Sequence, residues 1–106
     1  MVTLQTQSMI MAIGRKYASV LQGKIRLRGL FVFGSYAKGA YDDDSDIDIA
    51  VIADDFSGDM INDRHFLMKL RRQVDIRIEP HPFLSSDFTD TNPIALEILR
   101  TGIKIV

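Results

Sequence analysis

Two acidic side chains beside a flexible turn are the residues of this sequence that could do chemistry. The turn is Gly34-Ser35, and ten residues separate it from Asp46, which is followed two positions later by Asp48. The apolar run 49–53 continues directly from Asp48 and predicts a β-strand. Side chains two positions apart in a strand point to the same face, with Cα atoms roughly 7 Å apart. That arrangement suits two divalent cations about 4 Å apart, which together displace a leaving group at phosphorus.

The turn itself could bind phosphate. An unbroken apolar run, residues 30–33, predicts a strand covered on both faces before the turn. Ser35 can then cap a short helix that runs to Lys38, so that backbone N–H groups at the helix start would point at an anion. Gly34 lets the backbone approach a ligand closely because it has no Cβ. Taken alone, this is a plain strand–helix connection with a serine cap, but the carboxylates downstream favour a phosphate site.

The same residues resemble the signature of a known family. The string is Gly34-Ser35-Tyr36-Ala37-Lys38-Gly39, followed by Ser45-Asp46-Ile47-Asp48-Ile49. It is similar to the signature of the polymerase-beta-like nucleotidyltransferases, and its spacing and the short length most resemble the minimal, antitoxin-type members (MNT). The resemblance implies a polymerase-beta-like fold, one minimal domain over residues 1–106, and two Mg²⁺ ions with ATP as substrate. It also implies that Gly34, Ser35 and Lys38 bind the nucleotide.

By the resemblance, three carboxylates bind the first metal ion, and Asp46 and Asp48 share the second. Residues 74–79 alternate apolar and charged side chains and predict a strand closed by Pro80. Asp75 starts the charged face of this strand, which would join the face of the other two carboxylates. We therefore expect Asp46, Asp48 and Asp75 to be both catalytic and metal-binding.

Other polar residues have competing interpretations. Asp75 could belong to a solvated strand face shared with Arg77 and Glu79. Asp63 and Asp87 are alternative third carboxylates, on a predicted helix start and a predicted loop that would hold them less rigidly. Family members often have Arg where this chain has Lys38, and Lys cannot make the same bidentate contact to phosphate.

Two histidines and an acidic run have simpler explanations. His65 is expected on a helix surface and His81 in a loop between prolines, and neither has ligand spacing with the other or with the carboxylates. The run Asp42, Asp43 and Asp44 is expected to be a solvated loop. An EF-hand is excluded, because the glycine of its sharp turn and its last Glu ligand are both missing here.

Composition excludes several classes of protein. The 106 residues suit one domain, and no cysteine is present for disulfides or thiolate metal sites. A net charge of -1 argues against gripping nucleic acid by bulk charge, although a local basic patch of Lys69, Arg71 and Arg72 stays open. No apolar run reaches the roughly 20 residues that span a bilayer, so we expect a cytoplasmic protein with no membrane partner.

The periodicity predicts an α/β (α+β) domain with a small mixed sheet. The expected order is α-β-α-β-α-β-α-β, with helices over 3–21, 35–38, 62–72 and 93–101 and strands over 25–33, 47–53, 74–79 and 103–106. Asn62 or Asp63 would cap the third helix, and residues 83–92 would form a loop. In so short a chain no region is left to hold the acceptor of a transferred nucleotide.

The acceptor is therefore expected on another chain. Family resemblance points to a HEPN-type toxin, modified by AMP on a tyrosine and thereby silenced. A second possibility is a binding module that neutralises its partner by contact alone. Transfer to a small molecule is a third, and self-association into a homo-oligomer stays open.

Overall fold

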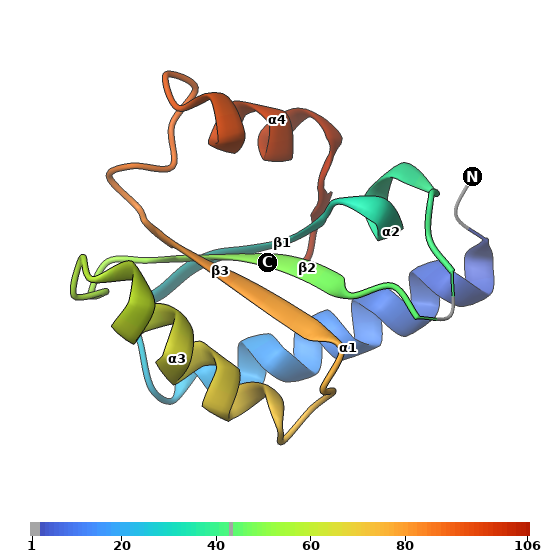
Figure 1. Cartoon of the computed structure of the whole chain (residues 1–106), viewed down its shortest axis with the longest axis horizontal. Helices are drawn as coiled ribbons and strands as arrows, with labels where there is room; N and C mark the ends of the chain where they lie inside the picture. The colour runs from blue at the N-terminus through green and yellow to red at the C-terminus, as the bar shows by residue number, and fades with distance from the viewer. Residues whose placement is uncertain (1–2, 43) are drawn as a thin grey trace.

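The computed structural model describes residues 3–42 and 44–106, so Asp43 of the predicted solvated loop lies outside the described residues. Helices and strands alternate along the chain (Figure 1). The elements are α1 (Leu4–Gln22), β1 (Leu27–Phe33), α2 (Ser35–Lys38), β2 (Ile47–Ala53), α3 (Met60–Arg71), β3 (Ile78–Leu84), α4 (Pro93–Thr101) and β4 (Ile103–Lys104). The predicted order of elements is confirmed.

The strands form one mixed sheet in the order β3-β2-β1-β4. β1 is antiparallel to β2 and to β4, whereas β3 is parallel to β2. The connection from β2 to β3 therefore crosses over through α3, as a parallel pair requires. This confirms the predicted α/β (α+β) class with a small mixed sheet.

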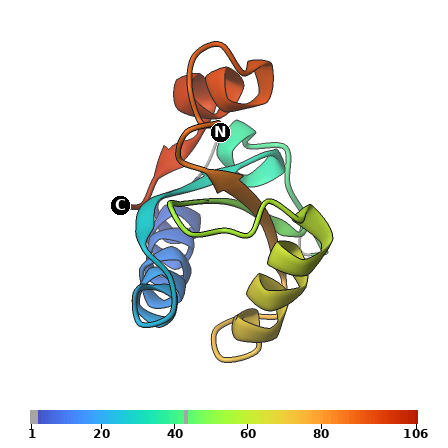
Figure 2. The same ribbon diagram turned by 90° about the vertical axis from the view of Figure 1, so that its left-hand side faces the viewer.

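The two faces of the sheet carry separate apolar clusters. α1 and α3 cover one face, and α4 stands over the other (Figure 2). The larger cluster lies under α1 and α3 and includes Ile47, Ile49 and Ile78. The smaller one lies under α4 and is built from Ala50, Ile52 and Ile98, with phenylalanines at its edge. Because β2 alternates between these clusters, its even-numbered side chains face α4.

The predicted strand 74–79 is wrong, because the strand begins at Ile78 and continues through both prolines. Backbone hydrogen bonds at its two ends, Ile47 N–H to Arg77 O and Ser85 N–H to Ala53 O, place the odd-numbered residues of β3 toward β2. Pro80 and Pro82 are even-numbered, so their missing N–H groups lie on the outer side of an edge strand. Prolines at these positions remove no hydrogen bond from the sheet.

Two predicted helix caps also differ. Asp59 caps α3, accepting hydrogen bonds from the N–H groups of Ile61 and Asn62, so α3 starts earlier than predicted. Gly34, not Ser35, occupies the cap position of α2, and α2 has no side-chain cap. No helix in residues 3–42 and 44–106 has the length and apolar character needed to cross a membrane.

Candidate functional site

The first two predicted carboxylates lie at the start of β2. Asp46 is exposed and directly precedes the strand, and Asp48 is its second residue. Ile47 between them is fully buried in the cluster under α1 and α3. The side chain of Asp48 is on the opposite face, under α4, and keeps 29% of its surface exposed. The two faces of β2 thus differ at this point: Ile47 is buried on one face, and the carboxylate of Asp48 is partly exposed on the other.

The Gly-Ser turn lies directly against Asp48. Phe33, the last residue of β1, is the register partner of Asp48, and Gly34 follows it with φ of 73°. A Cβ on Gly34 would overlap with the Oδ2 atom of Asp48. Ser35 then starts α2, and the Lys38 N–H closes this helix by donating to Gly34 O at 3.1 Å. The structure therefore brings the predicted turn and one predicted carboxylate into contact.

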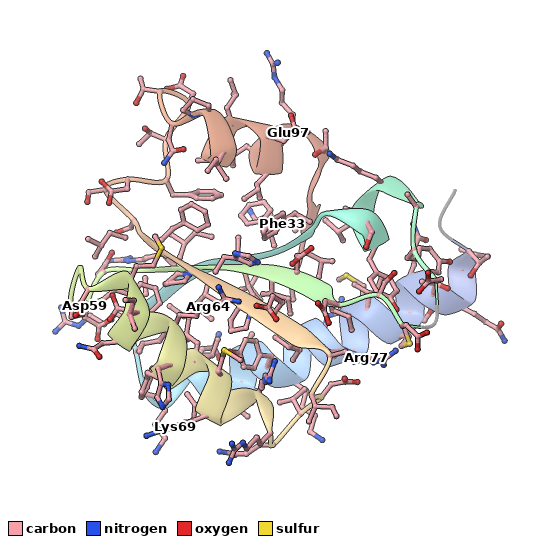
Figure 3. All side chains as sticks on the ribbon, viewed as in Figure 1. Phe33, Asp59, Arg64, Lys69, Arg77 and Glu97 are labelled. Atoms are coloured by element: carbon pink, nitrogen blue, oxygen red, sulfur yellow. The ribbon has the colours of Figure 1, made fainter. Side chains whose placement is uncertain are left out.

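Lys38 reaches away from the turn toward α4. Its Nζ lies 3.3 Å from Oε1 of Glu97, and the two side chains are 54% and 58% exposed. Figure 3 shows Glu97 on α4, the helix that stands over this face of the sheet. An ion pair this exposed is weak, so Lys38 can exchange Glu97 for another anion.

Asp75, the predicted third carboxylate, is placed differently from the expectation. It lies in the turn before β3, and its Oδ1 and Oδ2 accept hydrogen bonds from Arg77 at 3.1 and 2.9 Å. These hydrogen bonds hold the pKa of the Asp75 carboxyl below its ordinary value. Among the described residues no group of three His, Cys, Asp or Glu side chains could hold a metal ion. The structure thus does not join Asp75 to Asp46 and Asp48.

The two alternative carboxylates lie at the other end of the sheet. Asp63 accepts hydrogen bonds from the backbone of Ser57 and Gly58, which fixes the turn before α3. Asp63 and Asp87 both line a cleft of about 510 Å³ near Leu84, where β3 ends. Asp48 is near the start of β2, so the cleft is separate from the predicted catalytic residues.

Glu79 occupies the position that the sequence analysis gave to Asp75. It is the register partner of Asp48 on the parallel strand β3, so the two side chains share a face of the sheet. Its carboxylate is paired with Arg64 of α3, and Nη1 of Arg71 lies 4.0 Å away. In Figure 3, Arg64 lies beside β3, and Lys69 is on the far side of α3. Arg71 also donates to Ile78 O and so points toward β3, whereas Lys69 points away from it. These two residues of the predicted basic patch therefore do not share one surface.

His81 is a residue of this site that sequence reasoning missed. Its Nε2 lies 3.2 Å from Oδ1 of Asp48, and its ring meets that of Phe33 edge-on, with centroids 5.0 Å apart. The signal in the sequence is its spacing of two from Glu79, which puts both on one face of a strand. It was hidden because the flanking prolines indicated a loop.

A comparison with protein families identifies the family of the chain. The family described as polymerase beta, nucleotidyltransferase matches residues 15–106. The chain belongs to this family. The family expected from the Gly-Ser turn and the two aspartates is therefore confirmed.

Individual relatives agree with the family. A candidate protein adenylyltransferase of Methanocaldococcus jannaschii is 40% identical over 52 residues, which are 49% of this chain and 52% of that protein. The chain thus spans about half the length of this curated relative.

Solved structures share the fold. A candidate nucleotidyltransferase from Sulfolobus solfataricus has a TM-score of 0.66 at 18% identity, covering 95% of this chain and 83% of that one. A toxin–antitoxin structure with AMP-PNP has a TM-score of 0.64 at 24% identity, covering 88% of this chain and 72% of that one. At these identities the likeness supports the polymerase-beta-like fold.

The carboxylates of this site have the right chemistry for Mg²⁺, a hard cation that prefers oxygen ligands. Asp46 takes part in no ion pair between described residues, and the side chain of Asp48 is within hydrogen-bond distance of His81. Glu79, in contrast, is held by arginines. The carboxylates of Asp46 and Asp48 are therefore available to bind a metal ion. Glu79 could join them only after its ion pairs with the arginines break.

Proposed function

We propose that this nucleotidyltransferase uses Mg²⁺ to move AMP from ATP to a hydroxyl acceptor. The contact of the Gly34 turn with Asp48 carries the proposal, because it places a possible phosphate-binding backbone beside a carboxylate. The adenylyltransferase name of the Methanocaldococcus relative supports AMP as the transferred group. The AMP-PNP in a structure of the same fold supports ATP as the donor.

Each residue of the site has a proposed role. Asp46 and Asp48 would hold two Mg²⁺ ions, which neutralise charge on the triphosphate and favour the deprotonated hydroxyl. Glu79 would be the third carboxylate, since it is the register partner of Asp48. In this proposal Asp75 is structural, because its two carboxylate oxygens are already bonded to Arg77.

The turn would position the phosphates. The backbone N–H groups at the start of α2 and the Ser35 hydroxyl would donate to phosphate oxygens, and Lys38 would leave Glu97 to add a positive charge. The acceptor hydroxyl would lose its proton to solvent, its oxygen would bond to the α-phosphorus, the bond between that phosphorus and the oxygen bridging to the β-phosphorus would break, and pyrophosphate would leave. Most of the rate enhancement would come from positioning and charge neutralisation.

We further propose that residues 1–106 act as one minimal domain and that the acceptor is a tyrosine of a HEPN-type toxin. A toxin–antitoxin pair is the subject of the structure with AMP-PNP, which supports a toxin as partner. Modification of the toxin would silence it. The cytoplasmic location expected from the sequence stays a prediction.

One observation favours a second function, neutralisation by contact alone. Glu79 is paired with Arg64 and lies near Arg71, and no described group of three ligands is assembled. A protein that had lost catalysis could keep such pairs for stability. The two functions differ in whether the aspartates are needed.

A growth assay separates them. The protein is co-expressed with the product of the neighbouring gene, as wild type and as the Asp46→Asn/Asp48→Asn variant, and association is measured by gel filtration. Loss of growth rescue by a variant that still associates supports the enzyme. Unchanged rescue supports the contact-only module, and failure of the wild type to associate counts against a partner encoded there.

A further inference from the structure

We propose that His81 is a positioning residue that fixes the carboxylate of Asp48 for metal binding. This inference rests on the proposed function, because it assigns a role within the same site. It is carried by the contact of Nε2 with Oδ1 of Asp48 at 3.2 Å and by the structure around the ring.

The imidazole of His81 is held from several sides. The edge of its ring contacts Phe33 with centroids 5.0 Å apart and an interplanar angle of 64°. Pro80 and Pro82 restrict the backbone on both sides of it. Its side chain is 35% exposed, and Phe33, which it contacts, packs against the cluster under α4. A side chain restrained in this way can orient a neighbour.

The two oxygens of Asp48 have different surroundings. Oδ1 lies 3.2 Å from Nε2 of His81, within hydrogen-bond distance, and Oδ2 lies where a Cβ on Gly34 would be. The contact with His81 therefore orients the carboxylate on the Oδ1 side, and the missing Cβ of Gly34 leaves room for Oδ2. Asp46 makes no side-chain hydrogen bond to any other described residue, so it lacks this restraint. The site thus contains one oriented and one adaptable carboxylate.

Such a contact matters because groups that orient a metal ligand contribute to affinity. Loss of a partner that orients a ligand costs about 10- to 100-fold in metal affinity or activity. The contact needs only a proton on Nε2, which one neutral tautomer of imidazole provides. Glutamine can place an amide N–H at a similar distance from the backbone, whereas phenylalanine keeps the ring but has no donor.

The test compares Mn²⁺ affinity, measured by electron paramagnetic resonance without nucleotide, with the KM and kcat of AMP transfer. The variants are His81→Gln, His81→Phe and the donor-free His81→Leu. His65→Phe is a matched control, because His65 is exposed on α3. Urea unfolding reports on folding of each variant.

We expect His81→Phe and His81→Leu to bind Mn²⁺ about 10- to 100-fold more weakly than wild type, with His81→Gln recovering most of the loss. If folded His81→Phe or His81→Leu binds Mn²⁺ as tightly as wild type while Asp48→Asn binds it weakly, the role of His81 is overturned and the proposed function is not. A wild-type protein that binds no Mn²⁺ and transfers no AMP would overturn the proposed function, and the role of His81 with it.

Discussion

Gly34 and Asp48 are in contact at the centre of the site, so that a side chain on the glycine would overlap with a carboxylate oxygen of the aspartate. The backbone at Gly34, with φ of 73° and ψ of -145°, is also one that residues with a Cβ rarely adopt. The glycine is therefore required both by conformation and by space. Its position connects the proposed phosphate-binding turn directly to a proposed metal ligand.

Gly34→Ala should abolish AMP transfer and lower the free energy of unfolding by roughly 1–3 kcal/mol, because it adds backbone strain and displaces Asp48. Gly58→Ala is the matched control: its φ is 88°, but nothing lies within 4 Å of an added Cβ. It should lose about 1 kcal/mol of stability and keep transfer. Urea unfolding and transfer rates measure both effects. Full transfer by Gly34→Ala would show that the contact is dispensable.

Glu79→Gln and Asp75→Asn should differ in activity. We expect Glu79→Gln to lower kcat by about 100-fold or more, because it removes the charge of the proposed third metal ligand. Asp75→Asn should stay within a few-fold of wild type, since Asp75 is bonded to Arg77 before β3. Steady-state kinetics at saturating Mg²⁺ makes the comparison. The opposite ranking would restore Asp75 as the third carboxylate.

The ion pair of Asp75 with Arg77 should make stability depend on pH in acid. The pKa of Asp75 is lowered in the folded protein by the hydrogen bonds from Arg77, so the pair stabilises the fold above the unfolded-state pKa, near 3.8. This stabilisation is lost as the pH falls through the lower, folded-state pKa. The excess stability of wild type over Asp75→Asn should therefore be constant near neutral pH and shrink below about pH 4. Urea titrations across this range measure the excess, and an excess that grows in acid would contradict the assignment.

Lys38→Gln should raise the KM for ATP several-fold and leave stability within about 1 kcal/mol, because its pair with Glu97 is exposed. Glu97→Gln removes the same pair from the other side and provides the control. It should change stability as little, without raising the KM. If both substitutions raise the KM equally, the ion pair between Lys38 and Glu97 is what matters, and a direct contact of Lys38 with the nucleotide is contradicted.

Much of the fold could be predicted because its signals are local. The boundaries of β2 and α2 follow from an apolar run and from glycines, which the sequence shows directly. The two aspartates could be placed at the start of β2 for the same reason. The closeness of Asp48 to Gly34 was not predicted, because it comes from the register of β1 with β2.

The rest depended on which strands are neighbours. Whether a proline is tolerated in β3 depends on the direction of each missing N–H, and only an edge position in the sheet provides the free side. With the strand at Ile78–Leu84 in place of 74–79, Glu79 and not Asp75 becomes the register partner of Asp48, and His81 contacts Asp48. Strand pairing is a tertiary property, so periodicity alone could not establish it.

The most direct test of the central claim is transfer of label from α-phosphate-labelled ATP, with Mg²⁺ present, into the co-expressed product of the neighbouring gene. The control is the Asp46→Asn/Asp48→Asn variant in the same complex. We predict label on the partner with wild type only, and a tyrosine as the labelled residue. Equal labelling by the double variant, or no label with wild type in an intact complex, would contradict transfer of AMP by these aspartates.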